Sequence, residues 1–480
     1  MLALEFTAYL CLMLGIGYWS LRHTHSNDDF LIGGRRLGPV TSAISAGASD
    51  MSSWLLLGLP GAVFAGGLVE GFWISTGLLI GAWLNWRLVA GRLRALSESL
   101  SAITLPTYLA RRFDDSNGAL RIATTAVILV FFTLYVAAGL KGGTLLFAHA
   151  FNAQPSVALL VTVTVVVSYT FLGGYLAVCW TDLVQGLLML SALTFCALLA
   201  TTAIADAPLS LAQVRPGVWH IATSWLSGAS LLAWGLGYFG QPHILARFFG
   251  IRSIADIPRA RRIGIGWMAL CLLLAVSIGL LGIGYHALYP LTGVSGDGGN
   301  SERIFLALTG AMFHPLLAGL VYAAVLAAVM STADSQLLVL SSALTEDLPW
   351  FRHWPDRHRQ WLSRAGIVGF AVIATLIAAN DSGTILDLVG YAWGGFGAAL
   401  GPVVLLSVTW RGTTRNGALA GLVVGAVTVY LCKNHVTIPG HYLYELLPGF
   451  FCALLAVVIV SKMTRLPGAE TLAAFDRAAQ

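Results

Sequence analysis

Hydroxyl and carboxylate side chains interrupt an otherwise apolar stretch of this chain. The stretch reads YAAVLAAVMSTADSQLLVLSSALTEDL, with Ser331, Thr332, Asp334 and Ser335 near its middle. Hydroxyl oxygens and backbone carbonyls suit a small dehydrated cation such as Na⁺, which needs several hard oxygen ligands. In the simpler alternative, the hydroxyls bond back to carbonyls of their own helix. The residues alone leave both interpretations open.

Two other apolar stretches combine glycine, proline and polar residues at mid-length. The first, PVTSAISAGASDMSSWLLLGLPGAVFAGG, contains Asp50 and Pro60, and the second, LLAWGLGYFGQPHILARFF, contains Gly240, Gln241 and Pro242. Glycine and proline weaken a helix. The helix ends that a break exposes offer carbonyls to a cation and amides to a carboxylate. In each case, close helix packing is the alternative explanation.

The elements that carry these residues are membrane helices. The 480 residues are 57% hydrophobic and only 10% charged, whereas a soluble domain carries about 25% charged residues. Many apolar blocks approach the roughly 20 residues that a membrane helix requires. We expect about thirteen spans, near residues 3–20, 40–67, 71–93, 119–149, 156–175, 181–205, 225–249, 263–288, 305–340, 362–380, 385–409, 416–432 and 444–463. Residues 1–465 are expected to form a single domain, followed by a short cytoplasmic tail at 466–480.

The spacing of the two broken stretches suggests an inverted repeat. They fall in the second and seventh spans, and an offset of five spans means that they cross the membrane in opposite directions. Interrupted spans at matching places in two halves are the best sequence indication of a transporter binding site. Non-helical backbone at this depth is tolerated only where it lines a cavity or is buried in protein.

The basic residues predict the orientation. If the N-terminus lies outside, all but four of the 27 Lys and Arg residues fall on the inside; the exceptions are Lys141, Arg215, Arg303 and Lys433. This distribution follows the positive-inside rule. The modest net charge of +5 is spread over short connections, so nucleic-acid binding is not expected. The six cysteines lie in or beside apolar blocks and are expected to be reduced packing residues.

At this point the chain resembles the sodium:solute symporter family, and within it the bacterial sodium/proline branch. The resemblance rests on SAGASDMSSWLLLGLPGAVF (45–64), YTFLGGYLAVCWTDLVQG (169–186), LLAWGLGYFGQPHILARF (231–248), AAVMSTADSQLLVLSSALTEDL (327–348) and GPVVLLSVTWRGTTRNGALAG (401–421). It implies an all-α integral membrane protein with a LeuT-type core of two inverted five-helix repeats. The core would occupy about 40–410, with one N-terminal and two C-terminal helices added.

The resemblance also implies roles for individual residues. The sodium ligands would be the carbonyls of Ala48, Met51 and Ala328 and the hydroxyls of Ser331 and Thr332. Asp50 matches a carboxylate important for sodium-dependent transport. Ser52 would connect the ion to the substrate. The matches to proline-binding positions are Trp234, Tyr238, Pro242 and Tyr135. An aromatic face suits proline, because it packs against the ring and attracts the ammonium group.

Two charges depart from the pattern of the proline branch. Lys141 lies inside the fourth span, and Asp334 follows the sodium-site threonine by two residues. Three explanations are open: a buried Lys141–Asp334 ion pair; titration or binding of a second cation by Asp334 with Asp182; or Lys141 reaching outward while Asp334 faces the inner vestibule. In some relatives the residue matching Asp182 helps to hold a second sodium. The second explanation would allow H⁺ to join or replace Na⁺. Arg35 matches a coupling position on the cytoplasmic side, with an ordinary loop anchor as the alternative.

The sequence therefore predicts a symporter of a bacterial inner membrane that imports L-proline with Na⁺ by alternating access. The first alternative is a symporter of the same fold that carries another amino acid, a vitamin or a carboxylate. A transporter-like sensor or a channel is a less favoured alternative. No phosphate loop, metal-ligand cluster or nucleophile–base set is recognisable, so we expect no enzyme. No obligate protein partner is evident beyond the lipid bilayer.

Overall fold

The computed structural model describes residues 2–22, 32–170, 174–205, 210–296, 298–351 and 354–479. Part of the family-like stretch at 169–186 and one basic residue, Arg352, lie outside these ranges. Regular structure in the described ranges is helical, apart from a single β-bridge between Leu37 and Ile251. The all-α prediction is therefore confirmed.

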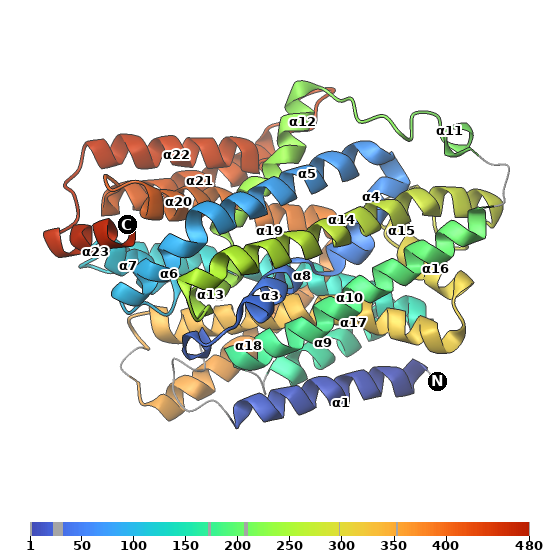
Figure 1. Ribbon diagram of the computed structural model, residues 1–480, viewed down its shortest axis with the longest axis horizontal. Coiled ribbons are helices and arrows are strands. Elements are labelled where there is room, and N and C mark those ends of the chain that lie inside the picture. The colour runs from blue at the N-terminus through green and yellow to red at the C-terminus, as the bar shows by residue number, and fades with distance from the viewer. Residues whose placement is uncertain are drawn as a thin grey trace.

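The helices follow the predicted order (Figure 1). The first part comprises α1 (Leu2–Leu21), η1 (Gly33–Arg35), α3 (Pro39–Asp50), η2 (Trp54–Gly58), α4 (Leu59–Gly66), α5 (Leu68–Leu84), η3 (Asn85–Val89), α6 (Ala90–Ser99), α7 (Leu105–Arg112), α8 (Ala119–Phe151), α9 (Pro155–Thr170) and α10 (Tyr175–Ile204). The second part comprises α11 (Leu211–Val214), α12 (Trp225–Leu232), η4 (Ala233–Gly240), α13 (Pro242–Gly250), η5 (Ile254–Asp256), α14 (Ile257–Leu288), α15 (Gly298–Ser301), α16 (Ile304–Met312), α17 (Pro315–Ser342), η6 (Ala343–Asp347), α18 (Asp356–Asn380), α19 (Ile385–Ala399) and α20 (Gly401–Thr409). It is followed by α21 (Arg415–His435), α22 (Leu446–Lys462) and α23 (Ala469–Ala479).

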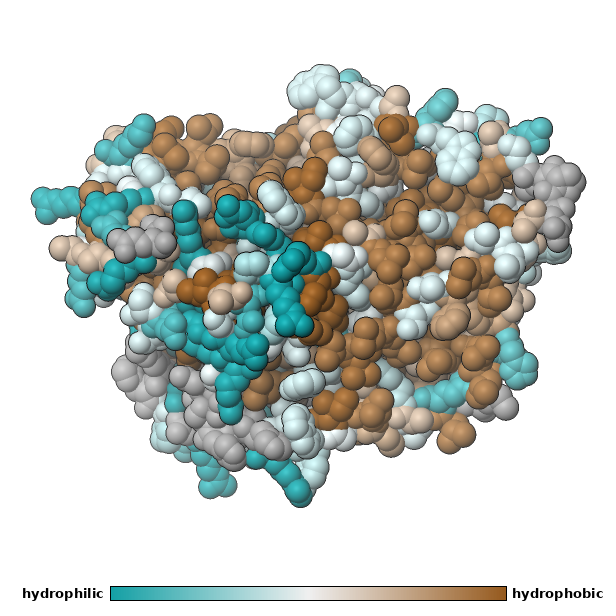
Figure 2. All heavy atoms as spheres, viewed as in Figure 1, coloured by the Kyte–Doolittle hydropathy of each residue, from teal (hydrophilic) through white to brown (hydrophobic). Residues whose placement is uncertain are grey.

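The surface of the bundle is that of a membrane protein. Eight of the described helices are long and apolar enough to cross a bilayer. Figure 2 shows a broad hydrophobic surface, with hydrophilic side chains gathered toward the end that holds α6, α7 and α23. We call this end, which carries many of the arginines, the basic end. The N-terminus lies at the opposite end (Figure 1).

One predicted span, the ninth, has the wrong start. The ninth span was expected to begin near residue 305, but α16 ends at Met312 and α17 begins at Pro315. Proline lacks the backbone N–H of a helix interior and is tolerated in the first turn. His314 caps the new helix, its side chain accepting a hydrogen bond from the Leu316 amide. The apolar run thus forms two separate helices.

Helix α17 occupies the centre of the bundle. Of the apolar window that marks it as a span, 83% is buried, against 17% for α18. It packs against α10, α8 and α3. A helix that is apolar all round is buried on all sides, so the few polar residues of α17 must meet partners from other helices.

Candidate functional site

The first broken helix stops at mid-length and then restarts. Regular α-helix ends at Asp50, Met51 has φ −82° and ψ 80°, and a π-helical turn begins at Trp54. The Asp50 carbonyl is thereby released from the helix ladder. It accepts hydrogen bonds from the Ser52 amide at 3.0 Å, the Trp54 indole at 3.0 Å and the Tyr135 hydroxyl at 3.2 Å. The predicted break is confirmed, and tertiary contacts satisfy its free carbonyl.

Oxygen atoms from this break and from α17 come together. The Ser331 hydroxyl lies 2.9 Å from the Ala48 carbonyl oxygen and 3.3 Å from that of Ala328. The neighbouring Thr332 hydroxyl is buried without a hydrogen-bond partner. Met51 lies at the helix end, one turn after Ala48. Neutral hydroxyl and carbonyl oxygens grouped around an unsatisfied hydroxyl fit a small monovalent cation.

The second broken helix is a long 3-10 segment between α12 and α13. It runs from Ala233 to Gly240, and Gln241 is extended, with φ −85° and ψ 105°. Its glycines allow backbone to touch backbone: a Cβ on Gly235 would lie 2.1 Å from the Gly77 carbonyl oxygen. The segment is therefore held by close packing on α5, and a larger residue at Gly235 would push the two backbones apart.

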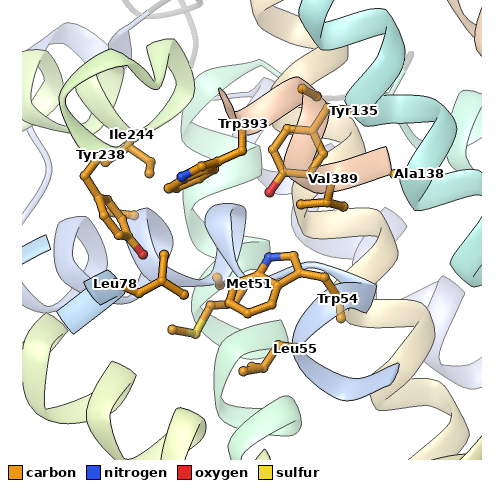
Figure 3. Close-up of a cluster of buried hydrophobic side chains, with 14 of the residues drawn as sticks. Met51, Trp54, Leu55, Leu78, Tyr135, Ala138, Tyr238, Ile244, Val389 and Trp393 are labelled. Carbon is orange, nitrogen blue, oxygen red and sulfur yellow. The ribbon is translucent and has the colours of Figure 1, made fainter. Parts of the chain in front are cut away.

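Aromatic side chains of this segment face the first break. Tyr238 donates a short hydrogen bond to a carboxylate oxygen of Asp50, whose other oxygen is buried without a partner. Its ring packs edge-on against Trp393, with centroids 5.0 Å apart. Figure 3 shows Tyr238 and Tyr135 on either side of Trp393, with Met51 and Trp54 below. The predicted substrate and ion residues thus form one continuous buried cluster.

Pro242 and Ser52 occupy the edges of the cluster. The Ser52 hydroxyl is buried and accepts a long contact from the Trp54 amide. Pro242 is the first residue of α13 and lines a cavity. Its other lining residues come from α7 and the loop before it, from α8, α10, α13 and α17, and from η6, and they include Arg247 and Asp347. The lining includes residues of α7, one of the helices at the basic end.

A buried ion pair, Asp182–Arg247, lies between the cluster and the cavity. The guanidinium Nη2 is 2.9 Å from a carboxylate oxygen of Asp182, and the two side chains are 2% and 0% exposed. Ser45 donates to the same carboxylate at 2.6 Å, and Arg247 donates to the Ser335 hydroxyl at 2.6 Å. The pair therefore connects α3, α10, α13 and α17. Arg247 was counted only among the basic residues expected on the inside, although it stands as a single charge in the apolar run PHILARFFG.

Asp334 lies close to this pair and away from Lys141. One of its oxygens accepts from the adjacent Ser335 amide at 2.6 Å, and the other is buried without a partner. Asp334 is within electrostatic reach of both Asp182 and Arg247. Its proximity to Asp182 is the arrangement that the second explanation requires; its titration stays a prediction.

Of the three explanations for these charges, the first, a buried Lys141–Asp334 ion pair, is wrong. The Lys141 ammonium instead lies 2.6 Å from a carboxylate oxygen of Asp381 and also donates to the Gly383 carbonyl. These two charged side chains are 22% and 29% exposed. A lysine side chain carries its ammonium group several ångströms from its Cα. The position of Lys141 inside the fourth span therefore suggested a more deeply buried charge than the structure shows.

Arg35 lies away from the cluster, at the basic end. It donates to the Phe249 carbonyl at 2.9 Å, to both oxygens of Ser97 at 3.1 Å and to the Ala102 carbonyl at 3.0 Å. These bonds join the segment before α3 to the ends of α6 and α13. The loop-anchor interpretation accounts for this geometry.

A further buried carboxylate binds the N-terminal end of α19. Glu302, in the loop before α16, accepts hydrogen bonds from the Ile385 and Leu386 amides at 3.0 and 3.2 Å. It thereby caps α19, the helix that carries Trp393, where a negative charge is favourable. Burial nevertheless raises the pKa of Glu302 to about 7, with the two amide bonds opposing the shift. Backbone of this loop also packs on Gly61 of α4.

Known proteins are similar in sequence to this chain over nearly its whole length. The sequence profile described as the Sodium:solute symporter family matches residues 30–425. A sodium/proline symporter of Salmonella typhimurium is 45% identical over 98% of this chain and 95% of its own. The high-affinity proline transporter PutP of Bacillus subtilis is 46% identical, with 95% and 96% covered.

Solved structures share the fold. A Na⁺-coupled sialic acid symporter, solved in a substrate-bound outward-open state, superimposes with a TM-score of 0.77 at 18% identity, covering 97% of this chain and 98% of its own. MHP1, a nucleobase-cation-symport-1 family transporter, gives 0.59 at 14% identity, with 94% and 99% covered. These neighbours confirm the LeuT-type fold. The chain is an integral membrane protein and belongs to the sodium:solute symporter family.

Proposed function

We propose that this protein imports L-proline together with Na⁺ by alternating access. The observation that carries the proposal is the contact between the first broken helix and α17, where Ser331 meets the Ala48 carbonyl beside the unsatisfied Thr332 hydroxyl. The identities of 45% and 46% to proline transporters over nearly the full chain support the choice of solute.

The cation would bind where the two helices meet. Carbonyl oxygens of Ala48, Met51 and Ala328 and hydroxyl oxygens of Ser331 and Thr332 would be its ligands. The Ser331 hydroxyl donates a hydrogen bond to the Ala48 carbonyl. A bound cation would replace that hydrogen bond, because it would take a lone pair from each of the two oxygens. Ion binding would therefore fix the distance between α3 and α17.

The substrate would bind beside the ion, at the aromatic part of the cluster. Proline is a compact zwitterion with an apolar ring, and Trp234, Tyr238 and Tyr135 would pack against it. Aromatic faces favour both an apolar ring and an adjacent ammonium group. Ser52, between the two sites, would contact the substrate.

Asp50 would couple the two sites. Its backbone belongs to the first break, and its side chain accepts from Tyr238 of the second. Cation binding that orders the first break would therefore also fix the aromatic pocket. A ligand shifts a conformational equilibrium only by its differential affinity for the two states. The ordered arrangement would bind both ligands better, and neither site would be complete alone. Transport requires no covalent step.

The orientation follows from charge. We place the protein in a bacterial inner membrane with the N-terminus outside and the basic end in the cytoplasm, because positively charged loops are retained there. The cavity lined by Pro242, Arg247 and Asp347 would then open toward the cytoplasm and serve as the release route.

Uptake by reconstituted vesicles tests the proposal. Purified protein is given labelled proline with an inward Na⁺ gradient alone, an inward H⁺ gradient alone, or neither. We expect concentrative uptake with Na⁺ alone. Competition by other amino acids, vitamins and carboxylates defines the solute. Accumulation driven by H⁺ alone would contradict the sodium assignment and favour the role predicted for Asp334; no proline accumulation under either gradient would contradict the solute.

A further inference from the structure

A segment outside the repeat core reaches into the aromatic cluster. It lies between α21 and α22, where Tyr442 is 47% exposed but Tyr444, two residues later, is 1% exposed. The Tyr442 amide donates to the Ser227 hydroxyl of α12 at 2.9 Å. The segment is thus attached to α12 immediately before Tyr444 turns inward.

Tyr444 forms a flat support for Trp234. The two rings are stacked, with centroids 5.1 Å apart and an interplanar angle of 25°. The Tyr444 hydroxyl donates to the Gly390 carbonyl of α19 at 2.7 Å. That hydrogen bond sets how deeply the Tyr444 ring lies between α12 and α19.

Glycines of α19 make room for both rings. A Cβ on Gly390 would lie 3.2 Å from the Trp234 ring, and one on Gly394 would lie 3.4 Å from the Tyr444 ring and hydroxyl. Trp234 is further fixed because its carbonyl accepts from the Trp393 indole at 2.8 Å. Its own indole N–H is buried without a partner. The structure therefore holds Trp234 in one orientation and leaves its indole N–H without an acceptor.

We propose that Tyr444 is a positioning residue that sets the size of the substrate ring this transporter accepts. The inference rests on the proposed function, in which Trp234 contacts the substrate. Tyr444 covers one face of the indole, so the substrate meets the remaining face and edge, at a depth that Tyr444 determines. A rigid support of this kind suits a compact cyclic amino-acid zwitterion and excludes larger rings. Without it, the indole could retreat and admit a wider ring.

Uptake kinetics of Tyr444→Ala and Tyr444→Phe test this role. Each is compared with wild type for labelled proline and for inhibition by the four-membered and six-membered ring analogues, azetidine-2-carboxylate and pipecolate. Because a stacked aromatic contact is lost, we expect Tyr444→Ala to raise KM for proline about tenfold, with kcat within about threefold. Pipecolate should become the relatively better inhibitor. Tyr444→Phe retains the ring and should recover most of the wild-type KM and selectivity.

Phe450→Ala is the matched control, because Phe450 of α22 packs against Phe239 of the same broken helix, with centroids 6.3 Å apart, and makes no ring contact with Trp234 in the described structure. It should leave the ratio of proline to pipecolate affinity unchanged. Equal KM values and ratios in wild type and Tyr444→Ala would overturn the inference, as would a loss of kcat alone. Failure of the wild type to take up proline would instead contradict the proposed function, and the same ratio would then be measured on the solute that it does carry.

Discussion

The two breaks in the core helices are built differently. At the first, the chain departs from helix for a few residues and exposes oxygens, three donors converging on the Asp50 carbonyl. At the second, the chain stays wound as a 3-10 segment and presents aromatic rings, with glycine packed directly on backbone. Oxygens suit an ion and rings suit an apolar zwitterion. Under the proposed function, ion and substrate would therefore bind mainly at different breaks, which the hydrogen bond between Tyr238 and Asp50 joins.

Asp50→Asn should have the largest effect, since it alters the residue shared by both breaks. The carboxylate is 1% exposed and accepts from Tyr238. Loss of a buried charge-assisted hydrogen bond costs about 1.5–3 kcal/mol, and loss of the coupling adds to it. We expect initial uptake of proline, normalised to protein amount, to fall about a hundredfold or more. Uptake above about a tenth of wild type would show that the breaks are not joined through this side chain.

Trp234→Leu should affect the second break and leave the first unchanged. It removes an aromatic face from the substrate side and leaves the oxygens near Ser331 in place. We expect KM for proline to rise about tenfold or more, while the Na⁺ concentration for half-maximal rate changes less than about threefold. The control is Trp225→Leu, because Trp225 lies on the preceding helix and is 81% exposed. Equal shifts in both constants would mean that the sites are not distinct.

Tyr238→Phe should have a smaller effect than Asp50→Asn, because it keeps the ring packed on Trp393 and removes only the hydroxyl. We expect kcat/KM for proline to fall about tenfold, in line with one lost hydrogen bond to a charged group. Within this variant, adding Asp50→Asn should cost less than it does in wild type, since the shared bond is already absent. Fully additive losses in this double-mutant cycle would contradict the connection.

The smallest effect is expected at Lys141 and Asp381. Their ion pair is about a quarter exposed, whereas Asp182 and Arg247 are buried. A partly exposed pair of this kind contributes at most about 1 kcal/mol. Asp381→Asn should therefore change uptake less than about threefold, while Asp182→Asn leaves a buried arginine unpaired and should abolish most activity. Comparable losses in the two variants would show that exposure does not distinguish these pairs.

The sequence was sufficient to locate both breaks, because glycine, proline and polar residues at mid-span have few other uses in a membrane helix. It also predicted the oxygens at Ser331 and Thr332. It could not predict partners that come from distant helices. Asp182–Arg247 joins residues 65 positions apart, and Tyr444 reaches Trp234 from outside the core. The sequence also did not show how far a long side chain reaches, so Asp381 was not among the partners considered for Lys141.

The most direct test of the account is whether Na⁺ binds between α3 and α17 without substrate. Thermal unfolding of the purified protein is measured with increasing Na⁺, with choline maintaining ionic strength. For wild type, saturating Na⁺ should raise Tm by a few degrees, about the shift expected for 1–2 kcal/mol of binding free energy. Thr332→Ala and Ser331→Ala should lose most of that shift. Ser341→Ala should retain it, because that hydroxyl, on the same helix, bonds only to the Leu338 carbonyl in the described structure. An undiminished Na⁺ shift in both Ser331→Ala and Thr332→Ala would contradict the sodium site and the coupling derived from it.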